Sequence, residues 1–185
     1  MAEPFQVATL VGSLREGSLN RKAARAIETL APPGLRFEEI GIGGLALYNQ
    51  DLEADPPREW VDFRDRVRPM DAILFVTPEY NRSVPGLLKN AIDVGSRPPG
   101  QSVWSGKPAA VVSVSPGAIG GFGANHHLRQ SLVFLDMPAL QQPEAYIGHA
   151  ADLFGDDGSV KNEGTKKFLR AFVDSFAAWI ARIRR

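Results

Sequence analysis

Residues 72–92, with the sequence AILFVTPEYNRSVPGLLKNAI, decide the fold. The first five are uniformly apolar, as in a parallel strand that is buried on both faces. After a polar loop, Pro85 is tolerated in the first turn of a helix, and apolar residues recur at helical spacing. These residues are Val84, Leu87, Leu88, Ala91 and Ile92. A buried strand, a polar loop and an amphipathic helix in this order predict one unit of an α/β domain.

The same alternation extends to both sides of this unit. Apolar runs predict further strands at 7–11, 35–40, 109–114 and near 137–140. Helical spacing predicts further helices from residue 19, over 60–67, over 128–135 and over 168–183. Neither an internal repeat nor an interdomain linker divides the chain, so we expect one domain over residues 1–185.

The order of the strands follows from this alternation. Strands that alternate with helices predict a parallel sheet with helices on both faces and right-handed crossovers. Of the two common doubly wound orders, the five-stranded flavodoxin-like order 2-1-3-4-5 fits 185 residues better. Strands one and three are then neighbours at the switch point, so a ligand site is expected in the loops after Val11 and Val76.

Composition excludes several classes of function. Lys plus Arg and Asp plus Glu number 21 each, so no global field attracts nucleic acid or an anionic membrane surface. The chain has no cysteine, which excludes disulfides, thiolate nucleophiles and cysteine-ligated metals. The adjacent His126 and His127 cannot chelate one ion from a helix, and no metal site is expected. Without a signal-peptide pattern or a run of ~20 apolar residues, we expect a cytoplasmic protein that acts on small molecules.

The loop after the first strand, GSLREGSLN at residues 12–20, runs into a predicted helix N-terminus. Backbone N–H groups and the helix dipole favour an anion there. Arg15 can pair with a phosphate, and Ser13, Ser18 and Asn20 can donate hydrogen bonds to it. We predict a site for a terminal phosphate monoester, although Ser18 as a helix cap and Arg15 as a solvated charge are an alternative interpretation. The glycines match neither a Walker motif nor a dinucleotide fingerprint, which disfavours ATP hydrolysis and a Rossmann NAD site.

The loop after the third strand, TPEYNRS at residues 77–83, suits a planar aromatic ligand. Pro78 and Tyr80 offer flat apolar contacts, and backbone amides around Glu79 and Asn81 can meet the polar edge of a flavin. An ordinary strand-to-helix turn is the alternative, because Pro and Asn favour turns in any case.

The loop after the fourth strand, at residues 115–121, is expected to flank the same crevice. Its glycines permit close backbone approach, and Ser115 can reach the rim of a flavin. A flexible turn capped by serine explains the local sequence equally well.

Two motifs together resemble the NADPH-dependent FMN reductase family, and the resemblance spans nearly the whole chain. They are Gly12-Ser13-Leu14-Arg15-x-x-Ser18-x-Asn20 and Pro78-Glu79-Tyr80-Asn81-x-Ser83-x-Pro85-x-x-Leu88-Lys89-Asn90-Ala91-Ile92-Asp93. The resemblance implies non-covalent FMN as cofactor and NADPH or NADH as electron donor. It implies that the FMN phosphate is held by Ser13, Arg15, Ser18, Leu19 and Asn20. It further implies that the isoalloxazine is lined by Pro78, Glu79, Tyr80, Asn81, Arg82, Ser83, Ser115, Gly120 and Gly121.

Members of this family include bacterial quinone, azo-dye and chromate reductases. The resemblance implies an enzyme that reduces quinones, azo compounds or oxyanions such as chromate by ping-pong hydride transfer, with no catalytic side chain of its own. The signature Leu128-Arg129-Gln130 is similar to that of homotetrameric members, so we expect a homo-oligomer, either a dimer or a tetramer. A flavodoxin-like electron carrier and a reductase that releases reduced FMN are the alternatives. Zero formal charge argues against the carrier, because such carriers are usually strongly acidic.

Two arginines are candidates for substrate binding. Arg82 lies beside Tyr80 and Asn81, and Arg97 follows the third helix. Together they predict a locally positive cleft mouth that attracts anionic acceptors. The alternative is that both are solvated or paired at an interface.

Overall fold

The computed structural model describes residues 3–155 and 157–184, and its centre is a parallel sheet. The strands are β1 (Phe5–Val11), β2 (Leu35–Glu39), β3 (Ala72–Thr77), β4 (Ala109–Val114) and β5 (Ala145–Ile147). They pair in the order β2-β1-β3-β4-β5, and each pairing is parallel. The predicted flavodoxin-like order is therefore confirmed.

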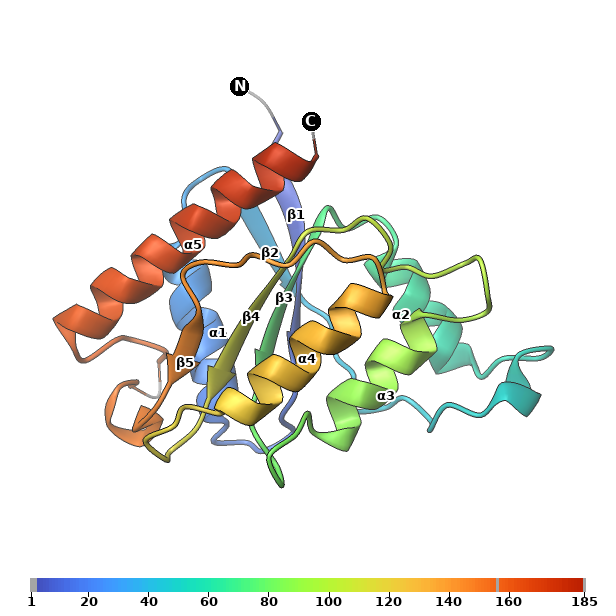
Figure 1. Ribbon diagram of the computed structural model, residues 1–185, viewed down its shortest axis with the longest axis horizontal. Coiled ribbons are helices and arrows are strands. Elements are labelled where there is room, and N and C mark those ends of the chain that lie inside the picture. The colour runs from blue at the N-terminus through green and yellow to red at the C-terminus, as the bar shows by residue number, and fades with distance from the viewer. Residues whose placement is uncertain (1–2, 156, 185) are drawn as a thin grey trace.

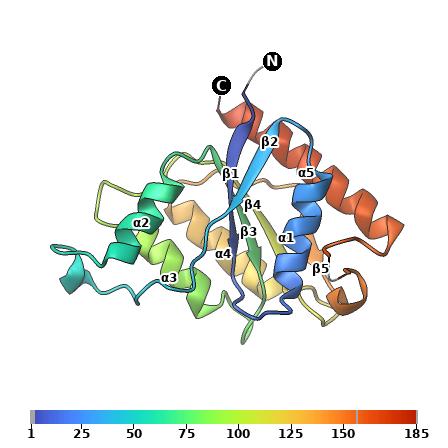
Figure 2. The same ribbon diagram turned by 180° about the vertical axis from the view of Figure 1, so that it is seen from behind.

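Helices cover both faces of this sheet (Figures 1 and 2). They are α1 (Leu19–Leu30), α2 (Arg58–Val67), α3 (Gly86–Gly95), α4 (Phe122–Phe134) and α5 (Glu163–Ile183), with short 3-10 helices η1 (Gln50–Leu52) and η2 (Ala150–Asp152). On one face, Ile27 of α1 and Phe172 of α5 pack in one core with Leu74 of β3. On the other face, Trp60 of α2 and Leu128 of α4 belong to a second core, which also contains Phe75 of β3. Within the described ranges, no helix combines the length and the apolar character that a membrane span requires.

The fifth strand differs from the prediction, which put a strand near residues 137–140. Met137 and Leu140 are buried, so the apolar pattern did mark core residues. The segment makes only an isolated bridge, in which Ala109 N donates to the Pro138 carbonyl and Leu140 N donates to the Ala109 carbonyl. The ladder does not continue, because the Leu140 carbonyl accepts a hydrogen bond from Arg129 Nη1 at 2.8 Å instead of one from β4. Continuous pairing with β4 begins only at Ala145–Ile147, so the predicted strand is wrong and the apolar run is a buried connection.

The strands β1, β3 and β4 end at one edge of the sheet. Val11 is paired with Val76, and Thr77 with Ser113. This edge lies at the bottom of Figure 1, whereas both ends of the described chain lie at the opposite edge. The loops that follow these three strands therefore converge, as the switch-point argument requires.

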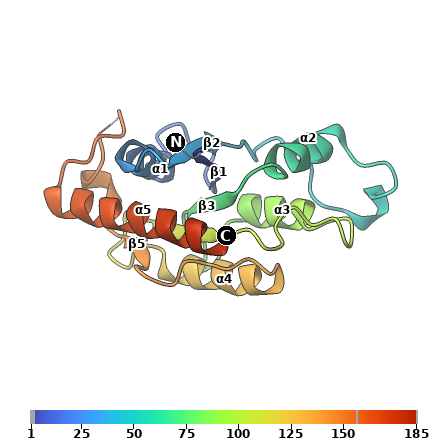
Figure 3. The same ribbon diagram turned by 90° about the horizontal axis from the view of Figure 1, so that it is seen from above.

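Most of the connection between β2 and α2, residues 41–57, forms a strap that extends past α2 and α3 (Figure 3). Asn90 of α3 anchors it, because Tyr48 N donates to Asn90 Oδ1 at 2.8 Å and Asn90 Nδ2 donates to the Ala46 carbonyl at 3.0 Å. The Tyr48 ring stacks on Trp60 with centroids 5.6 Å apart. The strap is thus tied to the core at its middle.

Candidate functional site

The loop after β1 brings the predicted phosphate-binding side chains to the start of α1. Ser13, Ser18 and Asn20 are buried, while Arg15 is exposed. Ser18 is the N-cap of α1, and its Oγ accepts a hydrogen bond from Arg21 N at 3.2 Å. The capping role considered for Ser18 is therefore present, and the hydroxyl proton can still be donated to a ligand.

Two features at this helix end suit an anionic, hydroxylated ligand. The N–H groups of Leu19 and Asn20 lie in the first turn, where a helix offers them no internal partner. Asn20 Oδ1 is buried and has no hydrogen-bond partner in the described part of the chain. An unsatisfied buried acceptor costs about 1–3 kcal/mol, and a ribityl hydroxyl would satisfy it. The residues present therefore fit the phosphate end of FMN.

The loop after β3 is a tight turn with an unusual backbone. Tyr80 and Ser83 exchange backbone hydrogen bonds of 3.2 and 3.0 Å, and the residues between them, Asn81 and Arg82, have φ of 51° and 64°. A left-handed conformation is natural for Asn but costly for Arg. The Tyr80 amide is used inside the turn, which leaves the Glu79 and Asn81 amides, among the described residues, for the polar edge of a ligand. The Tyr80 ring is 54% exposed and can lie against a planar group.

The Glu79 side chain points away from any such ligand and toward α4. Its Oε2 accepts a hydrogen bond from Ala124 N at 3.0 Å, and its Oε1 lies 3.5 Å from the Arg82 guanidinium. Only the backbone of Glu79 can therefore serve the role predicted for it.

The loop after β4 contains a hydrogen-bonded turn. Ser115 Oγ accepts a hydrogen bond from Gly117 N at 3.1 Å, which is the serine-capped turn considered above. Gly120 has a φ of 66°, and a Cβ there would lie 2.6 Å from the Tyr146 carbonyl carbon, so no other residue fits. Gly121, with a φ of 76°, is the N-cap residue of α4. The backbone of the loop at Gly120 thus packs directly against the backbone of β5 at Tyr146.

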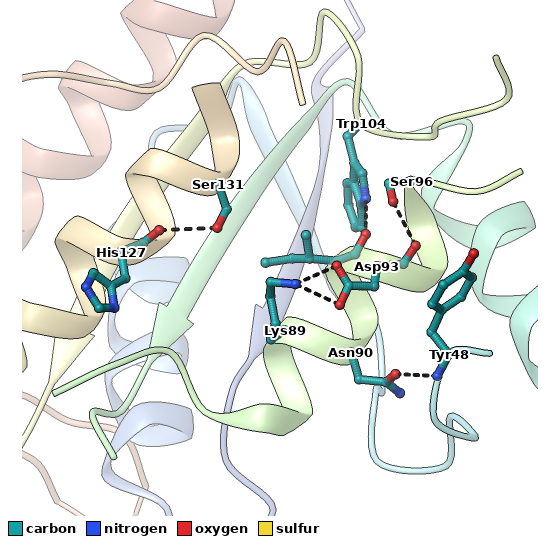
Figure 4. A network of polar contacts seen from close by, with 9 residues as sticks. Tyr48, Lys89, Asn90, Asp93, Ser96, Trp104, His127 and Ser131 are labelled. Atoms are coloured by element: carbon teal, nitrogen blue, oxygen red, sulfur yellow. Dashed lines mark hydrogen bonds and ion pairs between the residues drawn. The ribbon is translucent and has the colours of Figure 1, made fainter. Parts of the chain in front are cut away.

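The two arginines predicted at the cleft mouth lie at opposite ends of α3. This helix has 10 residues, and such a helix is about 15 Å long. Arg82 precedes it, whereas Arg97 follows it, with its guanidinium 5.7 Å from the centre of the Tyr48 ring. Arg97 lines a separate cavity of about 750 Å³, beside the Lys89–Asp93 ion pair and Tyr48 of Figure 4. One chain therefore does not bring the two arginines together.

An aromatic cluster on the outer side of α4 was not predicted from the sequence. Phe122 lies 4.1 Å from the His126 ring and 5.3 Å from the Tyr146 ring, and His126 Nε2 is 3.0 Å from the Tyr146 hydroxyl. The pKa of Tyr146 is raised to about 12, mainly by burial and to a smaller extent by the Glu144 carboxylate. The i, i+4 spacing of Phe122 and His126 was a visible signal, but their partner on β5 lies 20 residues away from His126 and was not.

Comparison with known proteins identifies similar chains. The family model described as NADPH-dependent FMN reductase matches residues 5–152. A quinone reductase from Pseudomonas putida is 66% identical over 181 residues, which is 97% of this chain and 97% of the relative. A 2-hydroxy-1,4-benzoquinone reductase from Burkholderia sp. is 46% identical over 95% of this chain and 96% of its own. The solved structure of FerB, a flavoenzyme NAD(P)H:(acceptor) oxidoreductase from Paracoccus denitrificans, has a TM-score of 0.92, 47% identity and coverage of 96% and 98%.

Proposed function

The chain belongs to the NADPH-dependent FMN reductase family, and from that premise we propose that it is an FMN-dependent NAD(P)H oxidoreductase that reduces quinones. FMN is the cofactor and NAD(P)H is the electron donor. The observation that carries the proposal is the convergence of three loops at one sheet edge, with the unsatisfied Asn20 Oδ1 at the start of α1. The names of the quinone reductases described above support the acceptor class.

The residues of the chain bind and orient the cofactor. Ser13, Arg15, Ser18, Leu19 and Asn20 hold the phosphate through side chains and helix N–H groups. Residues 78–83 line the isoalloxazine, and Ser115, Gly120 and Gly121 close the other side. When bound, FMN supplies the chemistry, since it takes up a hydride and passes its electrons on. No side chain is assigned an acid or base role.

The exposure of the Tyr80 ring supports a flavin with one open face, at which both the nicotinamide and the electron acceptor would bind. We extend the proposal to ping-pong kinetics, in which the nicotinamide leaves before the acceptor binds. Azo compounds and chromate are proposed as further acceptors. Arg82, with its side chain 73% exposed, is the cation at this end of α3 that attracts anionic acceptors. Arg97 is proposed to attract anionic acceptors more weakly at this site, because it lies at the other end of α3.

The protein is also proposed to form a homo-oligomer, a dimer or a tetramer. Val133 and Phe134, at the end of α4, are 79% and 91% exposed. Exposed apolar residues that lie together favour association. Packing of β1 and α5 in one core supports the further proposal that residues 1–185 form a single domain.

Flavin retention and the rate of NADPH oxidation distinguish this proposal from its two alternatives, an electron carrier and a reductase that releases reduced FMN. Purified protein should keep FMN through gel filtration and oxidise NADPH rapidly when a quinone is added. Loss of all flavin on the column, with activity restored only by free FMN, would instead indicate a reductase that releases its flavin. A stable semiquinone with slow NADPH oxidation would indicate an electron carrier.

A further inference from the structure

The Glu79 carboxylate is held by another element, although it lies in the loop predicted to line the flavin. The side chain is only 13% exposed, and Oε2 accepts from Ala124 N at 3.0 Å. Ala124 is the third residue of α4, which begins at Phe122. Glu79 therefore caps a helix that starts 43 residues later in the chain.

Helix α4 depends on this outside cap. Its N-cap residue is Gly121, which has no side chain to accept a hydrogen bond, and its first turn contains no acidic residue. A helix N-terminus carries partial positive charge and unpaired N–H groups. A carboxylate satisfies both, and a hydrogen bond to a charged group is stronger than one between neutral groups.

Two further contacts join the same segments. A Cβ at Gly123 would lie 2.7 Å from the Arg82 carbonyl oxygen and 2.9 Å from Glu79 Oε2, so the α4 backbone lies directly against the turn. One turn further along α4, His127 Nδ1 is 2.9 Å from Ser83 Oγ. The turn after β3 and the start of α4 are thus joined by two hydrogen bonds, with a close backbone approach between them.

We propose that Glu79 is a positioning residue that couples the two ring-binding loops. By capping α4 it fixes the end of the 115–121 loop relative to the turn at 80–83, and it sets the flavin environment without its carboxylate touching the flavin. The inference rests on the proposed function, because it needs FMN bound between these loops. It differs from a merely stabilising cap in that loss of Glu79 must change the bound flavin.

Three variants test this coupling. Glu79→Ala removes the cap, Glu79→Gln keeps an oxygen acceptor without the charge, and Gly123→Ala forces the segments apart while the carboxylate stays. Glu163→Gln is the matched control, because it removes a carboxylate from the first turn of α5, where Glu163 is 88% exposed. For each variant we would measure FMN affinity, the circular dichroism of the bound flavin, the unfolding midpoint of the apoprotein and amide exchange over residues 122–125.

We expect Glu79→Ala to weaken FMN binding about tenfold, to alter the flavin circular dichroism and to speed amide exchange at the start of α4. Glu79→Gln should be intermediate, Gly123→Ala should resemble Glu79→Ala, and Glu163→Gln should match the wild type. If Glu79→Ala lowers only the unfolding midpoint, with affinity and spectrum unchanged, the inference is overturned. If that variant does not fold, wild-type affinity and spectrum in both Glu79→Gln and Gly123→Ala overturn it. The proposed function stands in either case, because the wild type still binds FMN.

Discussion

Ser18 combines a structural role with a proposed ligand-binding role. Its Oγ caps α1 by accepting from Arg21 N, and it lies beside the N–H groups expected to bind phosphate. Arg15, which is exposed, has only the proposed role. Substitutions at these two positions can therefore separate folding from binding.

Replacing Arg15 and Ser18 together with Ala is expected to weaken FMN binding at least about tenfold, because hydrogen bonds to a charged group are lost. Ser18→Ala also removes a cap, which costs about 1 kcal/mol of stability. Ser18→Asp is the control, since Asp caps equally well but repels phosphate. It should keep the apoprotein unfolding midpoint and still lose FMN affinity, as fluorescence titration would show. Unchanged affinity in a folded double variant would refute the phosphate site.

Arg82 allows its charge to be separated from its backbone strain. Arg82→Gly and Arg82→Ala both remove the charge, so both should raise KM for chromate more than KM for a neutral quinone, and the difference should shrink as salt rises. Only Gly relieves the left-handed φ of 64°, so denaturant unfolding should find Arg82→Gly more stable than Arg82→Ala by about 1 kcal/mol. Equal losses for both acceptors would contradict the proposed attraction of anions.

At the scale of elements, sequence patterns predicted the sheet well because each buried strand carries its own apolar run. The exception is instructive. The run at 137–140 is as apolar as a strand, but its pairing with β4 stops at one bridge because the Leu140 carbonyl binds Arg129, and the real β5 has only three residues. The capping of α4 by Glu79 could not be predicted either, because it depends on how closely two segments approach in space. The helix length, by contrast, already implied that Arg97 lies far from Arg82.

The strap over residues 41–57 should depend on Asn90. Asn90→Ala removes the hydrogen bonds to Tyr48 and Ala46 shown in part in Figure 4, and it should lower the free energy of unfolding by about 1–3 kcal/mol. Limited proteolysis should then cleave the strap faster. Asn49→Ala is the control, because Asn49 caps only the exposed η1. If both variants lose equal stability, Asn90 is not the anchor of the strap.

At the scale of the whole molecule, the exposed end of α4 is the surface proposed for self-association. Phe134→Lys should shift the mass measured by light scattering toward the monomer, because it places a charge where the proposed interface would bury the exposed Phe134 ring. Leu47→Lys, at a position 79% exposed on the strap, is the control. A wild type that is already monomeric at micromolar concentration would remove the proposal.

The fold could be predicted as a whole, and so could the edge at which the loops meet, because both follow from strand order. Which atoms face a ligand could not. In the turn at Asn81 and Arg82, the Tyr80 amide donates to the Ser83 carbonyl. The Glu79 carboxylate accepts a hydrogen bond from α4 and does not face a ligand. Both facts arise from backbone geometry that a residue pattern does not encode.

The most direct test of the proposed function is an anaerobic titration of the purified, FMN-containing protein, followed by absorbance. One equivalent of NADPH per bound flavin should bleach the oxidised flavin spectrum, and one equivalent of a benzoquinone should then restore it, with the flavin still on the protein after gel filtration. A bound flavin that NADPH does not reduce, or a reduced flavin that the quinone does not reoxidise, would contradict an FMN-dependent NAD(P)H quinone reductase.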